Sequence, residues 1–379
     1  MKYVGYLLSL FSLLLCVACE KEDEPVIEQE PGRTVLVYIA ADNNLSSSVE
    51  GDLSMMELGL QGADMRNGNL LAYVDRRNQN PQLIRFVQEK DSVRREVIEN
   101  YPIDHSSATP ERLGEVLRQV TQAFPSDHYG LILWSHGTAW LPYSYKSYLR
   151  SFGVDGGNHF MSANDLAAAL ADYHFDFLLF DACYMGSLEV AYALRHVTDY
   201  LIASPTEVLV DGFPYQLFIG DLFAAEVNAA HVAAQFYAYY EKSYGTVSAI
   251  QTAELDELAA ICRTIFKDKS EEELFAVSVK ELQLLEYLTG SVHALYDAAD
   301  YVRQLATDAQ WAQFESCLER VVLYKAATPK SAYSYPSYGG GSFLPIERFC
   351  GLSIYVPQRE LSELNTWYQQ MEWYQAVYQ

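Results

Sequence analysis

Short apolar runs that alternate with helical patterns constrain this chain more than any other feature of its sequence. The runs are continuous and rich in aliphatic and aromatic residues. They occupy residues 34–40, 70–74, 131–134, 175–180 and 200–203. Runs of this kind are typical of strands buried on both faces of a parallel sheet. The first half of the chain therefore predicts an α/β fold with a largely parallel sheet flanked by helices.

Helical patterns with clear start signals lie between these runs. Thr109 and Pro110 have the order of a cap followed by proline at the first helical position. Ser162 and Asp165 resemble a capping box. From about Phe213 onward helical patterns dominate. They cover 229–241, 254–266, 271–287 and 291–305, with strand candidates at 247–251 and 352–356, and the Tyr- and Gly-rich residues 331–342 predict a long loop.

The charge balance excludes one large class of partner. The chain has 50 Asp and Glu against 26 Lys and Arg, a net charge of -24, and its basic residues are scattered singly. Such a surface repels a phosphate backbone, so we expect no nucleic-acid partner. Cationic partners suit it better, although solubility alone would also explain the charge.

The first residues have the composition of an export signal. Lys2 precedes a mostly apolar run, 4–18, that is too short for a membrane span. The run ends in LCVAC, which resembles the lipobox of bacterial lipoproteins. That resemblance implies that 1–18 is a signal peptide and that Cys19 becomes the acylated first residue. We therefore expect a lipid anchor in the membrane and no spanning helix.

Residues 19–32 are predicted to form an acidic, solvated tether. They resemble the acidic export tags of surface lipoproteins in Bacteroidetes, which predicts an exported lipoprotein of the outer membrane and leaves its periplasmic and outer faces both open. The spacing of the remaining cysteines indicates neither a dense disulfide framework nor a zinc site. They are Cys183, Cys262, Cys317 and Cys350.

Two reactive side chains directly follow neighbouring strand candidates. The run 131–134 leads to His136, and the run 175–180 leads to Cys183. Ligands of open parallel sheets bind beyond the carboxyl ends of the strands, so we expect the two side chains to lie close together. A cysteine attacks as its thiolate, and a nearby imidazole or helix N-terminus can activate it.

The residues beside this pair suggest further roles. Gly186 and Ser187 are expected to open a helix over 188–196, whose first N–H groups could stabilise a tetrahedral oxyanion. Gly137, next to the histidine, is expected to leave room for a substrate backbone.

At these residues the chain resembles the caspase–gingipain–clostripain superfamily of cysteine peptidases, and its clostripain-like branch most of all. The resemblance covers most of the chain from about Arg33. The matching stretches are DNNL at 42–45, LILWSHGTAW at 131–140, FDACYMGSLEVAY at 180–192, ASPTEV at 203–208, DGFPY at 211–215 and GLSIYVP at 351–357. The resemblance implies a caspase-like core over 33–212, with a helix-rich region, 213–379, that completes it or packs on it.

The resemblance also implies an endopeptidase that acts on proteins or peptides and cleaves after Arg or Lys. Cys183 would be the nucleophile and His136 the general acid, with no third residue assigned. Asp181 matches an acid that lines the specificity pocket, where a carboxylate would pair with a guanidinium or ammonium group. Glu207 and Asp211 are weaker candidates for the same pocket.

Relatives in this branch are often zymogens that cut themselves between the histidine and the cysteine. The basic residues of that interval are Lys146 and Arg150, and we predict cleavage after Arg150 before Lys146. Some relatives depend on calcium. This sequence has no EF-hand loop and no carboxylate spacing that specifies calcium ligands, so no metal ligand is assigned.

Other catalytic classes fit poorly. The sequence contains neither the G-x-S-x-G of serine hydrolases nor the H-E-x-x-H of zinc proteases. The main alternative is a catalytically inactive surface lipoprotein, an adhesin or binding module with the same fold. A second alternative keeps the chemistry but cleaves after Asp, which would require a basic pocket.

Overall fold

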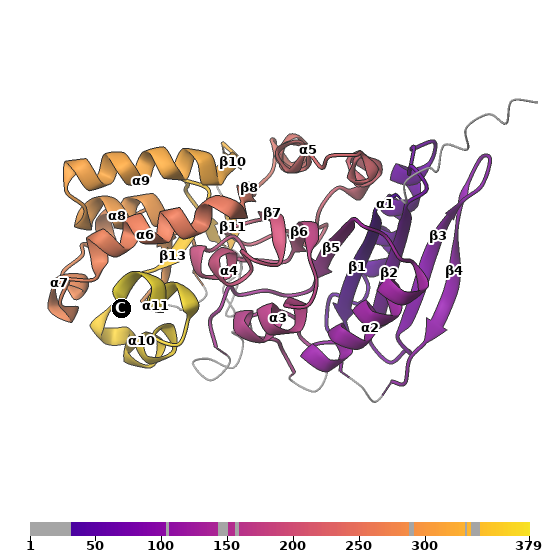
Figure 1. Ribbon diagram of the computed structural model, residues 1–379, viewed down its shortest axis with the longest axis horizontal. Helices are drawn as coiled ribbons and strands as arrows, with labels where there is room; N and C mark the ends of the chain where they lie inside the picture. Colours follow the sequence, from indigo (N-terminus) through magenta and orange to yellow (C-terminus); the bar gives the residue numbers. More distant parts are fainter. Residues whose placement is uncertain are drawn as a thin grey trace, which may run out of the picture. The chain divides into compact units, whose positions relative to one another are not determined.

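Nine strands form one mixed sheet in the part of the chain that the structure describes (Figure 1). The computed structural model describes residues 32–103, 106–142, 151–155, 159–287, 292–329, 332–334 and 342–379. The strand order is β10-β8-β7-β6-β5-β1-β2-β3-β4. The strands are β1 (Thr34–Ala41), β2 (Asn69–Arg76), β3 (Gln82–Gln88), β4 (Val93–Asn100), β5 (Tyr129–Trp134), β6 (Phe175–Asp181), β7 (Thr198–Ala203), β8 (Thr246–Gln251) and β10 (Val322–Ala327).

The centre of the sheet is parallel and its two ends are antiparallel. Strands β7, β6, β5, β1 and β2 pair in parallel, whereas β8 and β10 at one end and β3 and β4 at the other are joined by antiparallel pairings. The five apolar runs of the sequence are these parallel strands. The predicted α/β fold class is therefore confirmed. Strands β8 and β10 come from the C-terminal half, so the second half of the chain contributes to the same sheet.

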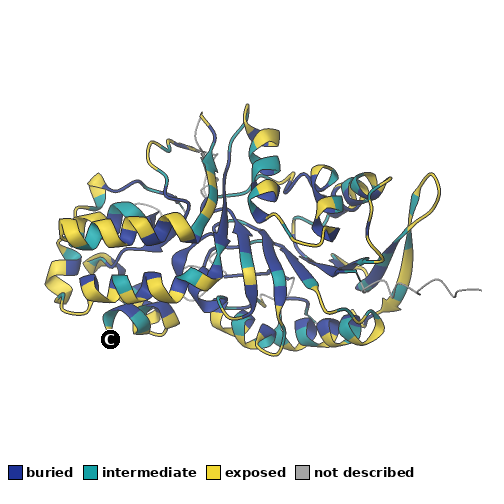
Figure 2. Cartoon of the chain, turned by 45° about the horizontal axis from the view of Figure 1, so that its top comes forward, coloured by how far each residue is buried: buried dark blue, intermediate teal, exposed yellow. Residues whose placement is uncertain are grey.

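The central strands are buried on both faces, which explains their continuous apolar runs. Along β1, alternate residues enter two separate cores: Tyr38 belongs to one and Val37 to the other. Helices α2, α3, α4 and α6 contribute to the first core, and α1 and α5 to the second. Figure 2 shows the buried sides of these helices toward the sheet and their exposed sides outward.

The helices are α1 (Val49–Leu60), α2 (Pro110–Ala123), α3 (Ala163–Leu170), α4 (Leu188–Ala193), α5 (Ala229–Tyr240), α6 (Leu255–Phe266), α7 (Glu271–Phe275), α8 (Ala298–Leu305), α9 (Asp308–Val321), α10 (Ser362–Tyr368) and α11 (Glu372–Tyr378). Short 3₁₀ turns are η1 (Tyr215–Leu217), η2 (Ile219–Phe223), η3 (Thr252–Glu254), η4 (Val279–Glu281) and η5 (Arg359–Leu361). Both predicted helix starts are confirmed. Thr109 caps α2 through the Arg112 N–H, and Ser162 forms a reciprocal capping box with Asp165 in α3.

Several elements were absent from the sequence prediction. Strands β3 and β4 form an edge hairpin whose charged residues alternate with apolar ones, so they lack a continuous apolar run. Helix α1 contains two glycines, Gly51 and Gly59, which weaken its helical pattern. Helix α9 was also missed, and the predicted helix over 188–196 ends early, at Ala193.

Two predicted helices of the C-terminal half are wrong over much of their length, because long-range pairing replaces helical bonds. The expected helix 271–287 ends at Phe275. Farther along, the Gln283 carbonyl accepts from the Asp297 N–H at 2.9 Å, a long-range bond in place of a helical one. The expected helix 291–305 starts only at Ala298. Asp297 caps it and ends strand β9 (Leu295–Asp297), which pairs with β13 (Ser353–Tyr355).

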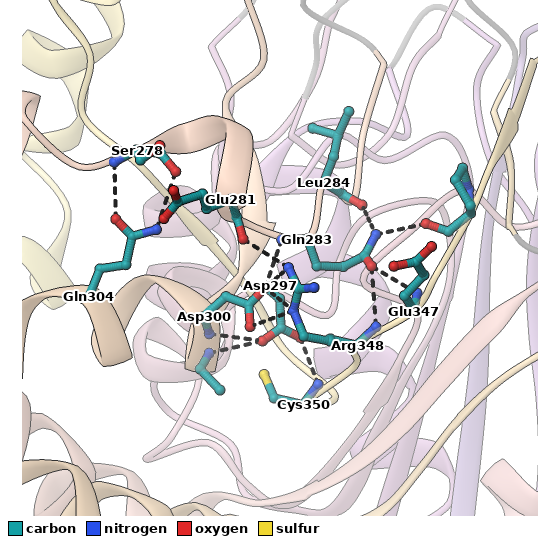
Figure 3. A network of polar contacts seen from close by, with 12 residues as sticks. Ser278, Glu281, Gln283, Leu284, Asp297, Asp300, Gln304, Glu347, Arg348 and Cys350 are labelled. Atoms are coloured by element: carbon teal, nitrogen blue, oxygen red, sulfur yellow. Dashed lines mark hydrogen bonds and ion pairs between the residues drawn. The ribbon is translucent and has the colours of Figure 1, made fainter. Parts of the chain in front are cut away.

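A polar network stabilises this rearranged region (Figure 3). The Gln283 side-chain oxygen accepts from the Arg348 N–H at 3.2 Å, and the Arg348 guanidinium pairs with Asp300 at 2.8 Å. The Asp297 carboxylate accepts from the Cys350 N–H at 2.6 Å. These contacts join three segments that are far apart in the sequence, and no local pattern specifies them.

The predicted loop 331–342 is partly a hairpin. Its ends form strands β11 (Ala332–Ser334) and β12 (Ser342–Leu344), which pair antiparallel, and residues 335–341 lie outside the described part. Throughout the described residues, no helix combines the length and apolar character that crossing a bilayer requires.

Loss of Arg33 is expected to destabilise the fold. Its side chain is 3% exposed, pairs with Asp176 and donates to three backbone carbonyls in residues 222–225. Arg33→Ala leaves these acceptors without their donor and should lower the free energy of unfolding by about 3–5 kcal/mol, measured by chemical denaturation. Arg94→Ala is the control, because the Arg94 pair with Glu89 is half exposed and should cost no more than about 1 kcal/mol. Equal losses in both variants would contradict this account.

Candidate active site

His136 and Cys183 follow neighbouring parallel strands and lie at the same edge of the sheet. Strands β5 and β6 pair with Trp134 opposite Asp181. The backbone N–H of Ser135 donates to the Asp181 carbonyl at 3.3 Å, which continues the pairing past the strand ends. Both side chains line one pocket of about 140 Å³, whose far wall is the segment after β7. This volume is smaller than that of most ligand sites, so the pocket is narrow in this conformation.

The Cys183 sulfur contacts the backbone of Val208 in that wall. The Val208 N–H donates to the sulfur at 3.3 Å, and the thiol donates to the Val208 carbonyl at 3.5 Å. Burial raises the pKa of the Cys183 thiol far above its usual range, and the negative charge of Glu207 raises it further. A thiol that donates a hydrogen bond is protonated. In this conformation the surroundings of the sulfur disfavour its thiolate form.

Neutralising Glu207 is expected to make Cys183 more reactive. Glu207→Gln removes the neighbouring negative charge, so the pKa of the thiol falls and the thiolate fraction at a given pH rises. Alkylation by iodoacetamide near neutral pH should be roughly three- to tenfold faster, and the pH profile of the rate should move to lower pH. Timed peptide mapping by mass spectrometry measures both.

The control for this experiment is Asp211→Asn, which removes an exposed carboxylate from the same loop. It should leave the alkylation rate almost unchanged. If Glu207→Gln reacted no faster than wild type, the electrostatic role of Glu207 would be wrong.

The turn after Cys183 has a strained backbone. Tyr184 has a φ of 64°, in the left-handed region, which costs a residue with a side chain roughly 1–2 kcal/mol. Its N–H donates to the Thr206 carbonyl at 2.8 Å, and its hydroxyl donates to Glu207 at 3.4 Å. These bonds hold the turn, which directs the chain sharply away from β6 just after Cys183.

His136 has a polar partner that the sequence analysis did not assign. Its Nε2 lies 2.8 Å from the side-chain oxygen of Asn44, within hydrogen-bond distance. Asn44 follows β1, the next strand in the sheet after β5. The adjacent Asn43 fixes the loop by donating to the Ala40 carbonyl at 3.1 Å and to the Val154 carbonyl at 2.7 Å. The DNNL stretch carried the signal for this contact, although no role followed from it.

Gly137 serves a different purpose from the one expected. A Cβ atom at this position would lie 2.5 Å from the Cys183 carbonyl oxygen. The space left by the missing side chain is thus filled by the backbone of the nucleophile loop and is not open to a substrate. Glycine is required here because it lets the histidine loop approach the cysteine loop closely.

Two of the N–H groups around the start of α4, where an oxyanion site was expected, already have partners. The Gly186 N–H donates to the Ser204 carbonyl at 2.9 Å, and the Val190 N–H donates to the Ser187 hydroxyl at 3.3 Å. These donors are already used within the fold. Helix α4 also has only six residues, so its dipole is short.

Asp181 lies at the base of the pocket and is 4% exposed. Its Oδ2 atom accepts from the Phe213 N–H at 3.0 Å and from the Tyr215 hydroxyl at 2.8 Å. Gly212 has a φ of 60°, and a Cβ there would lie 2.7 Å from the same oxygen. Burial raises the pKa of Asp181, and the two hydrogen bonds oppose that rise.

The other predicted site residues differ in their relation to the pocket. Glu207 lines it, whereas Asp211 is exposed in the turn after β7 and is not part of its lining. Cys19, Lys146 and Arg150 lie outside the described residues. Their predicted roles in lipidation and processing therefore stay predictions.

The described residues offer no convincing calcium ligands. The three-residue cluster with suitable spacing among them consists of Glu254, Glu257 and Cys317. A thiol is a poor ligand for calcium, and Arg320 already pairs with both carboxylates, at 3.0 and 2.7 Å.

Comparison with known proteins places this geometry in a family. The model of the clostripain family, a C11 peptidase family, matches residues 37–379. The chain belongs to the clostripain family. This clostripain-family chain is 29% identical over 220 residues to clostripain of Hathewaya histolytica, a match that covers 48% of the chain and 40% of that protein. The match thus spans less than half the length of that relative.

Two solved structures resemble the clostripain-family chain over nearly its whole length. An inactive zymogen of a C11 protease from Parabacteroides distasonis is 50% identical, with a TM-score of 0.87 over 93% of this chain and 100% of that one. A secreted C11 cysteine protease of Bacteroides thetaiotaomicron, in complex with an irreversible peptide inhibitor, is 33% identical, with a TM-score of 0.82 over 91% and 98%. The predicted family and its fold are confirmed.

Proposed function

We propose that the chain is a cysteine endopeptidase that cleaves after Arg or Lys, with Cys183 as the nucleophile and His136 as the general acid. The observation that supports this most is that Cys183, His136 and Asp181 line a single pocket. Thiol, imidazole and carboxylate there correspond to the three tasks of attack, proton delivery and recognition of a cation. A relative of known structure binds a peptide inhibitor irreversibly, which favours peptide substrates.

The proposed reaction proceeds through a thioester. The Cys183 thiol leaves the Val208 carbonyl and passes its proton to His136, and the sulfur attacks the peptide carbonyl carbon. The carbon–nitrogen bond then breaks as His136 delivers the proton to the leaving amine. Water hydrolyses the thioester, adding hydroxyl to the acyl carbon and returning a proton to the sulfur.

The preference for Arg or Lys follows from the charge of the pocket. Asp181 at the base and Glu207 in the wall are both acidic, and Asp211 adds a negative charge at the nearby turn. A guanidinium or ammonium group would pair with the Asp181 carboxylate, and its narrow surroundings strengthen that pairing. A side chain of Asp would meet repulsion instead.

Self-processing is expected to separate wild type from a nucleophile variant. Wild type should be cut after Arg150, or after Lys146, whereas Cys183→Ala should stay intact. Both basic residues lie between the proposed catalytic histidine and cysteine, and the related C11 protease from Parabacteroides distasonis is a zymogen. Intact-mass spectrometry of both purified proteins measures the outcome, with the double variant Lys146→Ala and Arg150→Ala as the uncleavable control. Identical fragments in wild type and Cys183→Ala would reject self-cleavage.

We also propose an exported lipoprotein held in the outer membrane by acylated Cys19, with 19–32 as its tether. The support is the signal-like composition of 1–18 and the lipobox resemblance. Such an anchor would leave the folded unit free to act on soluble proteins near the membrane.

A panel of fluorogenic peptides tests the proposed function against its alternatives. Peptides ending in Arg, Lys, Asp and Leu are offered to processed protein, with and without a thiol alkylator. Turnover of Arg or Lys peptides that the alkylator abolishes supports the peptidase. Turnover after Asp alone would overturn the specificity, and no turnover of any peptide would favour the inactive binding module.

A further inference from the structure

Asp52 is a carboxylic acid on the sheet-facing side of α1. The residues around it on that side, Val49, Leu53 and Met56, are apolar and belong to the second core. Asp52 is 2% exposed, and its Oδ2 atom is buried without a hydrogen-bond partner. A buried carboxylate oxygen without a partner costs free energy, so packing alone does not account for this residue.

The groups that act on the Asp52 carboxyl come from the strand ends that form the active site. The Trp134 indole, at the end of β5, hydrogen-bonds to it, and the charges of Asp181 and Asp211 raise its pKa in addition to burial. Trp134 and Asp181 line the pocket. Helix α1 packs against η1, and the Tyr215 hydroxyl of η1 donates to Asp181. Asp52 therefore lies near the pocket, and none of these neighbours is cationic.

Two tyrosines complete the surroundings. Burial raises the pKa of Tyr215 from η1 and of Tyr240 from α5, and the charges of Asp181 and Asp52 raise both further. These hydroxyls are therefore neutral, and they balance no negative charge. Asp52 and Asp181 are two buried carboxyl groups. Among the described residues that act on them electrostatically, none is a cation that could serve as a counter-ion.

Without a counter-ion, such a pair keeps a proton. Burial raises the pKa of both acids, and ionisation of Asp181 disfavours ionisation of Asp52. A cation placed against Asp181 would reverse this balance. One positive charge beside two carboxyls favours release of the retained proton to solvent.

We propose that Asp52 is a second determinant of specificity for a cationic side chain and acts through Asp181. This inference rests on the proposed function, which puts an Arg or Lys side chain of the residue before the cleaved bond (P1) into this pocket. Both hydrogen bonds to the Asp181 carboxylate end on Oδ2, so Oδ1 is the oxygen that a guanidinium would meet. Asp52 supplies the second negative charge nearby.

The first test compares two peptides that differ only in charge. P1 arginine and P1 citrulline have nearly the same shape, but citrulline is neutral. Asp52→Asn should lower the arginine-to-citrulline ratio of kcat/KM by about 10- to 100-fold, mainly through KM, and leave citrulline turnover within about twofold of wild type. Glu50→Gln, an exposed acid of the same helix that pairs with Arg76, is the control and should keep the wild-type ratio.

The second test measures the proton itself and needs only the wild-type pocket. An arginine peptide is titrated into processed protein whose Cys183 is blocked by methyl methanethiosulfonate, by calorimetry at neutral pH in two buffers with different ionisation enthalpies. Release of a large fraction of one proton is expected, and the same chain with Asp52→Asn added should release little. In wild type, KM for the arginine peptide should also rise as the pH falls, by up to about tenfold for each pH unit, because protonation of the pair competes with the cation.

The outcomes separate this inference from the proposed function. No turnover of arginine peptides by wild type would overturn the proposed function. Arginine turnover with an unchanged selectivity ratio in Asp52→Asn would overturn the role of Asp52 alone. If Asp52→Asn proved too unstable to assay, binding of the peptide to the processed and blocked wild type without proton release would still overturn that role.

Discussion

Cys183→Ala is expected to lower the turnover of Arg and Lys peptides by about 10⁴-fold or more. Alanine lacks the sulfur that forms the thioester, and the other groups of the site cannot replace that bond. Initial rates with fluorogenic peptides measure the loss. Alkylation of processed wild type at Cys183 should produce the same loss, which separates chemistry from processing.

The matched control for this prediction is Cys262→Ala. Cys262 is fully buried in α6, away from the pocket lining, so the variant should keep its activity. His136→Asn should cost about 10²–10⁴-fold on peptide amides. Its loss should be much smaller on an ester with a good leaving group, because that group departs without a proton. Activity that persists in Cys183→Ala would show that Cys183 is not the nucleophile.

The shared position of His136 and Cys183 at one edge of the sheet was predictable from the sequence, because it depends on topology alone. Each follows a continuous apolar run, and such runs become adjacent parallel strands whose carboxyl ends share one edge. No side-chain detail is needed for that step. The family resemblance then gave roles to the two residues, and Asp181 followed because it ends the same strand as the cysteine.

Asn44 and Asp52 could not be found in this way. Asn44 contacts His136 because β1 and β5 pair side by side in the sheet, and the role of an asparagine in a loop has no local signature. Asp52 stands in a helix with weak periodicity, where an acid normally indicates a solvated face. Its place near the pocket follows only from the packing of α1 against the sheet.

Misassigned helices in the C-terminal half have the same origin. Residues 283–287 and 295–297 have good helical patterns, but their backbone groups bond across to each other and to β13. Helix propensity amounts to a few tenths of a kcal/mol per residue, which tertiary pairing readily exceeds. Interactions between distant segments therefore determine the structure of residues 283–297. They also determine the positions of Asn44 and Asp52, so neither could be predicted from local sequence.

The contacts of the Cys183 sulfur and much of the pocket lining come from one segment. The segment after β7 bonds to the Cys183 sulfur through Val208, supplies Glu207 to the pocket, and covers Asp181 with Gly212. Any movement of this segment changes the surroundings of Cys183 and of Asp181 together. Measurements of specificity therefore have to be made on processed protein.

Asp181→Asn is expected to lower kcat/KM for Arg and Lys peptides by roughly 30- to 4,000-fold. Asparagine keeps the size of the side chain and an oxygen that can accept from the Phe213 N–H and the Tyr215 hydroxyl, so the loop after β7 should stay in place. The charge is lost, and removing one partner of a desolvated ion pair costs about 2–5 kcal/mol. Michaelis–Menten measurements on processed protein, with a Leu peptide as the neutral reference, report the change.

The direction of the loss distinguishes recognition from structural damage. If Asp181 recognises the cation, the Leu peptide keeps its low turnover, and alkylation of Cys183 is no slower than in wild type, because the charge of Asp181 also raises the pKa of the thiol. If Asp181 only supports the loop through Phe213 and Tyr215, all peptides lose activity in parallel and the alkylation rate changes with them. A parallel loss would therefore show that Asp181 does not recognise the cationic side chain. Glu207 in the pocket wall would then be the next candidate for that role.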